Sequence, residues 1–345
     1  MSGLQDAVKF KNVSVLSVAH ADAPNRVPSS WIEERLTPTM ERLGIAPGLL
    51  EGLSGIVARR WWDEGAMPSD AATLAAEKAI AAAGIDRERI GIVINTSVCR
   101  DYLEPSTACI VHGNLRLSPE CQNMDVGNAC LAFLNGMDIV ASMIEHGQID
   151  YGLVVDGEGS RFATSRTIER LLDPATDQKS FRDNFATLTL GSGGAAMVLT
   201  RSDLHPEGHA YLGGVSLAAS EHNRLCVGQP DQMVTDTKKL LFAGLELAQR
   251  TFERAKQQLG WTVDALDELC LHQVSKVHTE QLCALLGLPI ERALRIYPEY
   301  GNVGPASIAI VLSKAVEEGR IKAGSRVALM GIGSGLNCAM AEIRW

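Results

Sequence analysis

The chain has 345 residues, 46% of them hydrophobic, which is enough to bury a large core in two similar halves or two domains. Its formal net charge is −9 and no stretch concentrates lysine and arginine, so the sequence gives no electrostatic reason to expect binding to nucleic acid or to a membrane surface. The first twenty residues hold only short apolar runs, too short for a secretory leader or a membrane span. We therefore expect a cytoplasmic protein.

Helix and strand patterns alternate along the chain. Residues 68–83 start with Pro-Ser-Asp, continue as an alanine-rich segment and stop before Gly84, which predicts a capped helix. Residues 90–94 (IGIVI) then predict a buried strand. The same unit recurs later, with a helical pattern over residues 247–259 and a short apolar strand at residues 269–271.

An internal duplication underlies this alternation. Two pairs of segments resemble each other in the same order: 137–158 with 309–333, and 188–199 with 330–341. The chain is therefore predicted to consist of two copies of an α/β unit, residues 1–204 and 205–345.

The duplication also relates individual residues. Matching Gly147 to Gly319 places Cys130 opposite Asn302, so both are expected at equivalent strand-to-helix junctions. Aligning residues 90–95 with 267–272 likewise puts His272 at a strand end. Ligands usually bind at such positions in α/β sheets.

Cys130 is a candidate nucleophile. Residues 131–144 have helical spacing, so its sulfur is predicted at a helix N-terminus, where the helix dipole lowers a thiol pKa and activates the nucleophile. A buried structural cysteine is the alternative, since free cysteines are often buried. The eight cysteines form no CxxC pair, which favours free thiols over disulfides or a zinc site.

His272 and Asn302 are the candidate partners of Cys130. Taken singly, a core histidine and a turn residue between glycines are the competing interpretations. Together, a cysteine, a histidine and an asparagine at strand ends or helix starts form an acyl-transfer set. His205 and His209 lie in a Pro/Gly loop instead of on one helix face, and we expect no metal there.

Two further stretches bear on the chemistry. The glycine run 331–335 partly matches a dinucleotide fingerprint, but only ten residues follow it and they read as a strand, so a turn offering N–H groups to an oxyanion fits better. No GxSxG motif is present, which disfavours a serine hydrolase. Glu104 follows the strand at 90–95, where a solvated loop carboxylate is the default interpretation.

These motifs resemble the thiolase superfamily along essentially the whole chain, in the branch of ketoacyl synthase III and chalcone synthase. The resemblance is carried by NACLAF at Cys130, LHQVS at His272, GNVGPAS at Asn302 and the closing MGIGSGLNCAMAE. It implies a duplicated, five-layered αβαβα thiolase fold. RDYLEPSTA and MVTDT are most similar to the thiolases that start bacterial long-chain olefin biosynthesis.

By this resemblance Cys130 is the acylated nucleophile, while His272 and Asn302 stabilise thioester and enolate oxygens. The backbone N–H groups of Cys130 and of the Gly333-Ser334 turn are implied to form an oxyanion hole. Glu104 matches a carboxylate that acts as a base in the partner subunit's site, which implies a homodimer. Downstream olefin-pathway enzymes are further implied partners.

The implied reaction is a head-to-head Claisen condensation of two fatty acyl-CoA molecules to an α-alkyl β-keto acid, with CoA thioesters as substrates and no cofactor. Without decarboxylation, a base must remove a weakly acidic α-proton, which gives Glu104 a purpose. Degradative thiolases carry a second cysteine in the glycine turn, and residues 330–333 have none.

The sequence does not decide between this condensing enzyme and two alternatives with the same fold. One is a ketoacyl synthase III type enzyme that uses malonyl thioester, and the other is a non-catalytic acyl-binding partner subunit. The contacts of the CoA phosphates are also open. Arg59 and Arg60, or Lys238 and Lys239, are candidate contacts of the CoA phosphates, with solvated surface charge as the alternative for each.

Overall fold

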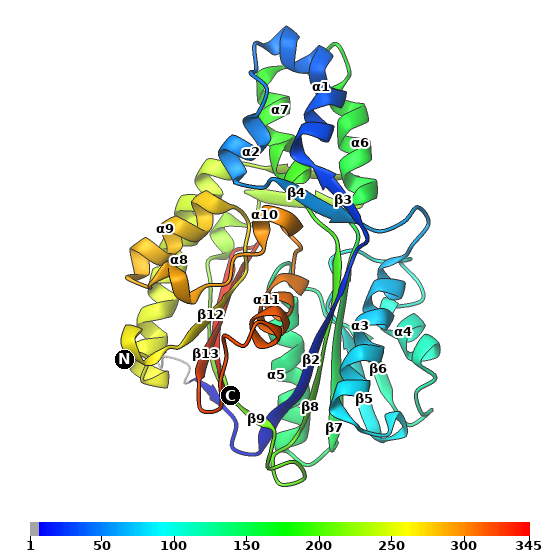
Figure 1. Cartoon of the computed structure of the whole chain (residues 1–345), viewed down its shortest axis with the longest axis vertical. Coiled ribbons are helices and arrows are strands. Elements are labelled where there is room, and N and C mark those ends of the chain that lie inside the picture. Colours follow the sequence, from blue (N-terminus) through cyan, green and yellow to red (C-terminus); the bar gives the residue numbers. More distant parts are fainter. Residues whose placement is uncertain (1–6) are drawn as a thin grey trace.

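A single path of hydrogen-bonded strands runs through both halves of the chain in the computed structural model, which describes residues 7–345 (Figure 1). The strand order is β12-β13-β14-β9-β2-β8-β7-β5-β6, and β1 pairs with β9. The strands are β1 Val8–Lys9, β2 Val13–Asp22, β5 Ile90–Asn95, β6 Gln122–Asp125, β7 Tyr151–Glu158, β8 Gly193–Arg201, β9 His209–Ala218, β12 Glu268–Leu271, β13 Arg326–Gly333 and β14 Asn337–Arg344.

The strands separate by their origin in the chain. The side from β2 to β6 comes from residues before 204, and the side from β9 to β12 comes from residues after it. The two sides meet through only two residue pairs between β2 and β9, Ser14 with Ala210 and Val15 with His209. Because this junction is so short, each side packs as a sheet of its own with helices on both faces (Figure 1).

Helices complete the five layers. One outer layer holds α3 (Pro68–Ala83) and α4 (Thr107–Leu115), the other α8 (Thr237–Leu259) and α9 (Lys276–Leu286). Between the two sides lie α5 (Ala132–Glu145) and α11 (Ala306–Glu317), seen near the centre of Figure 1. The predicted αβαβα thiolase fold is therefore confirmed.

A smaller lobe covers one end of the layers, at the top of Figure 1. Its elements are α1 Ser29–Leu43, α2 Leu49–Ser54, α6 Arg161–Leu171, α7 Gln178–Asn184 and the strand pairs β3 Asn25–Pro28 with β4 Ala58–Trp61 and β10 Cys226–Gln229 with β11 Gln232–Thr235. A separate apolar cluster that includes Ile32, Leu36 and Leu188 holds it together. The short α10 (Tyr297–Tyr300) packs on β4.

Residues 7–345 also contain five short 3-10 helices: Arg87–Arg89, Phe185–Thr189, Ser220–His222, Val263–Ala265 and Ile290–Arg292. Within residues 7–345, none of the helices combines the length and the apolar character that crossing a bilayer would require.

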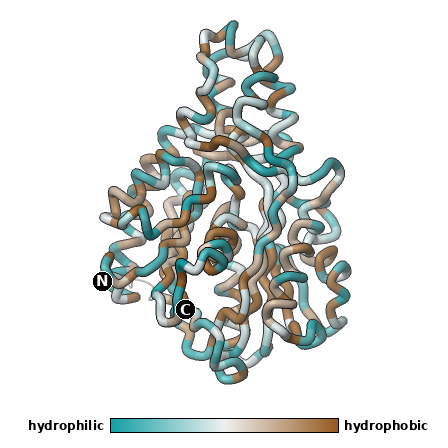
Figure 2. The backbone as a smooth tube through the Cα atoms, in the orientation of Figure 1, coloured by the Kyte–Doolittle hydropathy of each residue, from teal (hydrophilic) through white to brown (hydrophobic). Residues whose placement is uncertain are grey.

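The middle layer is the most apolar part of the fold. All residues of α11 from Ala306 to Ser313 are buried, and the central helices are largely brown in Figure 2. A helix in this position is enclosed by sheet on both sides, so it needs apolar residues all round. The alanine-rich helix predicted at 68–83 coincides with α3. The helix predicted from residue 247 begins ten residues earlier, because Asp236 caps it by accepting the N–H of Lys239.

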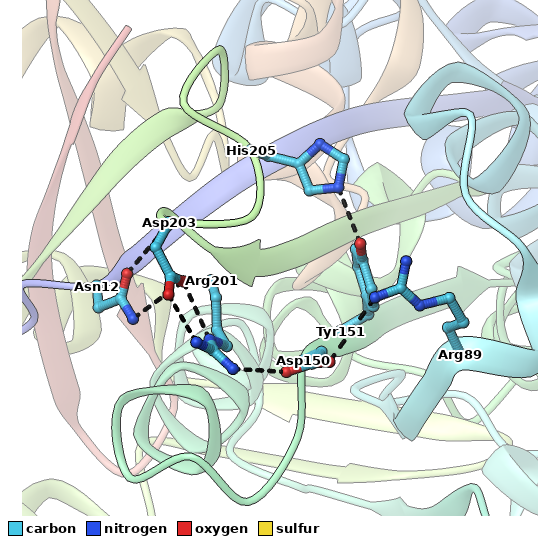
Figure 3. A network of polar contacts seen from close by, with 7 residues as sticks. All are labelled: Asn12, Arg89, Asp150, Tyr151, Arg201, Asp203 and His205. Atoms are coloured by element: carbon cyan, nitrogen blue, oxygen red, sulfur yellow. Dashed lines mark hydrogen bonds and ion pairs between the residues drawn. The ribbon is translucent and has the colours of Figure 1, made fainter.

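The segment that joins the two halves is held by a polar network (Figure 3). Arg201 pairs with Asp150 at 3.1 Å and with Asp203 at 2.6 Å, and the backbone N–H of Asp203 donates to the side chain of Asn12. The ring of His205 lies 2.9 Å from the hydroxyl of Tyr151. These contacts fasten the connection to β2 and to the start of β7.

The contact between β7 and α3 leaves no space for a side chain at Gly157. A methyl group there would lie 1.9 Å from the carbonyl oxygen of Pro68 and 2.9 Å from the nitrogen of Ala72. At Gly159, two residues on, a methyl group would meet nothing within 4 Å.

We expect Gly157→Ala to lower the free energy of unfolding by about 3 kcal/mol, because sheet and helix must separate. Gly159→Ala, the matched control, should stay within about 0.5 kcal/mol of the parent protein. Urea unfolding followed by circular dichroism measures both values, and equal stability of the two variants would contradict the packing described.

Candidate active site

Cys130 lies on a tight turn between β6 and α5. It comes two residues before the first residue of α5, and the N–H of Leu131 donates to the carbonyl of Asn128 at 3.0 Å. Ala129 has a φ of 45°, in the left-handed region that alanine rarely adopts. Such strain persists only where the surrounding packing enforces it, and it is common where a turn presents a reactive side chain.

The hairpin between β13 and β14 reaches the backbone of this turn. A methyl group on Gly333 would lie 3.2 Å from the nitrogen of Cys130 and 3.3 Å from that of Leu131, so a side chain there would press on this turn. The amide of Asn337 donates to the side-chain oxygen of Asn128 at 3.0 Å. The turn that contains Ser334 is thereby held beside Cys130.

Asn302 is fixed by its own backbone. Its N–H donates to the carbonyl of Thr189 at 2.9 Å, and its carbonyl accepts the N–H of Gly191 at 2.8 Å. The N–H of Gly304 donates to the side-chain oxygen of Asn302 at 3.1 Å. Because that oxygen already accepts, the NH₂ end of the amide is the one suited to donate to a ligand.

His272 follows directly after β12 and is only 2% exposed. Its backbone N–H donates to Met330 on the neighbouring strand at 2.9 Å. Burial, with a smaller contribution from His278, lowers the pKa of His272 to about 3. The imidazole is therefore neutral at physiological pH, so it provides a hydrogen bond rather than a positive charge.

The electrostatics of Cys130 differ from the sequence-based prediction. Burial, and next the carboxyl group of Glu158, raise the pKa of the Cys130 thiol to about 12. The helix dipole favours the thiolate, but desolvation beside carboxyl groups outweighs it. The predicted low pKa was wrong, and the resting Cys130 thiol is neutral at physiological pH.

Glu104 lies on an exposed loop, unlike Cys130, His272 and Asn302. It belongs to the loop 96–106 between β5 and α4, and it is exposed together with Leu103, of which 92% is accessible, and Tyr102. Within residues 7–345, no hydrogen bond or ion pair links the Glu104 side chain to another residue.

The predicted CoA contact at Arg59 is wrong. The Arg59 side chain is fully buried and donates to the carbonyls of Val27 and Leu188 and to the hydroxyl of Ser29. Burial lowers its pKa to about 10. A phosphate cannot reach it, because it ties β3, α1 and the segment before β8 together.

The other basic candidates lie nearer the surface. Arg60 is half-buried and stacks over the ring of Tyr300, with 5.5 Å between guanidinium carbon and ring centre. Lys239 pairs with Asp236 at 3.0 Å, and Lys238 is exposed. Neither Arg60 nor the lysines are enclosed in the way Arg59 is.

Two buried carboxyl groups were not predicted. Asp156 and Glu158 lie on β7, at 0% and 5% exposure, and both act electrostatically on Cys130. Their signal in the sequence is the pair of acids at alternate positions of the apolar strand YGLVVDGE. Among residues 7–345, no group of histidine, cysteine and acidic side chains is arranged to hold a metal ion.

Family comparisons agree with this arrangement. Two models described as 3-oxoacyl-[acyl-carrier-protein (ACP)] synthase III and its C-terminal part match residues 124–219 and 257–345. Together with the five layers and the cysteine at the start of the central helix, they define a condensing enzyme of the thiolase superfamily.

The relatives narrow the family further. The chain is 54% identical to an acyl-CoA:acyl-CoA alkyltransferase of Xanthomonas campestris pv. campestris, over 97% of this chain and 99% of that one. It is 39% identical to a protein of the same name from Shewanella oneidensis, over 98% and 100%. The chain therefore belongs to the OleA family of acyl-CoA condensing enzymes.

Solved structures of the Xanthomonas campestris OleA superpose closely. The cerulenin-bound form has a TM-score of 0.97 at 54% identity, over 98% of both chains. A cysteine-to-serine variant with bound lauric acid and lauroyl-CoA has a TM-score of 0.96 at 54% identity, over 97% of this chain and 100% of that one.

The raised thiol pKa predicts slow alkylation of Cys130. Because the thiolate is the reactive form, the rate constant with iodoacetamide should rise about tenfold per pH unit from pH 7 to pH 9 without levelling off. Peptide mass spectrometry at each pH measures this, with the exposed Cys109 as an internal reference for reagent activity. A rate at Cys130 that is independent of pH above pH 7 would indicate a thiolate and contradict this assignment.

Proposed function

We propose that the chain catalyses a non-decarboxylative, head-to-head Claisen condensation of two fatty acyl-CoA molecules. The product is an α-alkyl β-keto acid, formed with release of CoA as the first step of long-chain olefin biosynthesis. The observation that carries this proposal is the 54% identity, over nearly the whole of both chains, to a protein named acyl-CoA:acyl-CoA alkyltransferase. A relative that binds lauroyl-CoA gives further support.

The solved variants of the relative support the assignment of individual residues. One cysteine, one glutamate and one histidine of the Xanthomonas protein have been replaced. Their positions in that chain differ by one constant offset from Cys130, Glu104 and His272. We therefore assign the nucleophile to Cys130, the base to Glu104 and a hydrogen-bond donor to His272, with Asn302 as second donor.

In the first half-reaction, the sulfur of Cys130 attacks the thioester carbonyl of one acyl-CoA. The carbon–sulfur bond to CoA breaks, and the proton of the Cys130 thiol ends on the CoA sulfur. No net charge is created, which suits a site where both the thiol and His272 are neutral. The oxyanion is stabilised by the N–H groups of Cys130 and the Gly333-Ser334 turn, whose backbones lie in contact.

In the second half-reaction, Glu104 of the other subunit removes the α-proton of the second acyl-CoA. His272 and Asn302 donate hydrogen bonds to the enolate oxygen, which lowers the cost of removing so weakly acidic a proton. The α-carbon attacks the acyl-cysteine carbonyl, and the sulfur of Cys130 leaves and regains a proton. Hydrolysis of the remaining thioester releases the acid and the second CoA.

This scheme requires a homodimer, and the exposure of Glu104 supports it. The carboxylate projects on a loop whose tip is the almost fully exposed Leu103, next to the exposed Tyr102. A second copy of the chain would cover these apolar side chains and receive Glu104. CoA thioesters as substrates favour a cytoplasmic location, and downstream enzymes of the olefin pathway are the proposed partners.

We also propose that residues 1–204 and 205–345 are copies of one ancestral unit. Cys130 and Asn302 support this, since each lies on the turn that precedes a central helix, α5 in the first half and α11 in the second.

The reaction can be tested with a single long-chain acyl-CoA and no malonyl-CoA. We expect continuous release of CoA and a β-keto acid that contains two acyl chains, or the ketone formed when that acid decarboxylates, by mass spectrometry. One equivalent of CoA with a stable acyl-Cys130, and turnover only after malonyl thioester is added, would instead identify a ketoacyl synthase III activity. No acylation at all would indicate a non-catalytic subunit.

Two variants separate the half-reactions. Cys130→Ala should abolish acylation, whereas Glu104→Ala should retain it and slow condensation by about 100-fold or more, because the base is lost. Glu120→Ala removes an equally exposed loop carboxylate and should behave as the parent protein. Loss of acylation in Glu104→Ala would argue against its role as the base.

A further inference from the structure

Glu158 belongs to a pair of acids that face the interior from β7. Successive side chains of a strand point to opposite faces, and Gly157 faces α3 with no space for a methyl group. Asp156 and Glu158 therefore project from the other face of β7, the one covered by α5. This is the side on which Cys130 lies, and both acids act on the charge of its thiol.

The carboxyl group of Glu158 is bonded to one part of the proposed site and lies close to another. It accepts the N–H of Val98 at 2.6 Å and that of Cys99 at 3.3 Å, both at the start of the loop that carries Glu104. A methyl group on Gly304 would lie 3.4 Å from its carboxyl carbon, and Gly304 is the residue that orients the amide of Asn302. One buried side chain thus holds the start of the Glu104 loop beside the turn of Asn302.

The charge on this carboxyl group changes near neutral pH. Burial raises the pKa of Glu158 to about 7, despite the N–H groups and the Cys99 thiol that donate to it. The titratable groups around it are Asp156 on the same strand, Cys99 on the loop and Cys130 before α5, and none of them is a cation. An ionised carboxylate accepts hydrogen bonds from N–H groups more strongly than a neutral carboxyl group does. Protonation of Glu158 therefore weakens its hydrogen bonds to the loop.

We propose that Glu158 is a positioning residue for the condensation step, whose ionised carboxylate fixes the start of loop 96–106 and thereby the place where Glu104 meets its substrate. The inference rests on the proposed function and adds a second carboxylate to it. Glu158 acts in its own chain, whereas Glu104 acts in the partner's site. Acylation of Cys130 does not use Glu104, and the nearby carboxyl group of Glu158 disfavours the Cys130 thiolate, so loss of the Glu158 charge should slow condensation without slowing acylation.

If Glu158 only stabilised the fold, replacing it would lower the stability of the protein. The folded state raises the pKa of this carboxyl, so the stability that it costs grows as the pH rises from the ordinary glutamate range through about 7. Removing the charge in Glu158→Gln should therefore leave the urea midpoint at pH 8 equal to that of the parent protein or higher. A loss of condensation in a protein of undiminished stability is what the positioning role requires.

The test is a single-turnover comparison of Glu158→Gln with the parent protein between pH 5.5 and pH 9. Acylation is followed as acyl-Cys130 by mass spectrometry with one acyl-CoA, and condensation as β-keto acid after a second acyl-CoA is added. In the parent protein we expect the rate of condensation from the acylated enzyme to rise through about pH 7. In Glu158→Gln we expect acylation at least as fast as in the parent, condensation at least tenfold slower at pH 8, and loss of that rise.

Glu33→Gln is the matched control. Glu33 is a buried carboxylate that accepts two backbone N–H groups, from Gly48 at 2.6 Å and Leu50 at 2.7 Å, but it lies in the small lobe. It should leave both half-reactions and their pH dependence unchanged. A parallel fall of acylation and condensation in Glu158→Gln would overturn the positioning role, as would normal condensation beside an inactive Glu104→Ala.

Two outcomes lie outside this comparison. If Glu158→Gln does not fold, the parent protein decides the matter, because a rate of condensation from the acylated enzyme that shows no rise between pH 5.5 and pH 9 would overturn the inference. If the parent protein condenses no acyl-CoA at all, the proposed function fails and this inference fails with it.

Discussion

The burial of two helices between two sheets is the constraint on which the rest of this structure depends. α5 and α11 lie between the two sheets, so the positions that face the sheets are mainly apolar. Cys130 and Asn302 lie on the turns that precede these helices. The hairpin of β13 and β14 closes on the first of these turns because Gly333 has no side chain.

This enclosure also sets the chemical state of the site. Desolvation disfavours charge, and it keeps both His272 and the Cys130 thiol neutral at physiological pH. A neutral site suits the exchange of one thioester for another, in which no net charge develops. The base that we propose for carbon–carbon bond formation, Glu104, is by contrast exposed to water, where a charged carboxylate bears no desolvation cost.

Glu158 is the exception to this neutrality. Its carboxyl group is buried without a cation, at a cost in stability that a glutamine would avoid. Residues that break a general rule of protein interiors tend to mark functional sites. Here the residue accepts an N–H of the Glu104 loop and lies close to the turn of Asn302, the two elements to which we assign roles in condensation.

Local features of the sequence were sufficient for individual elements of the fold. The capped, alanine-rich pattern at 68–83 predicted α3, because capping and periodicity depend on neighbours along the chain. The layered thiolase fold was implied by the resemblance of the motifs around Cys130, His272 and Asn302 to a known superfamily, and it is confirmed. Burial and electrostatics depend on residues far apart in sequence, so only the tertiary structure could determine them. It enclosed Arg59 as a structural cation, raised the thiol pKa of Cys130 where the helix dipole alone predicted a low value, and brought Glu158 against the loop of Glu104.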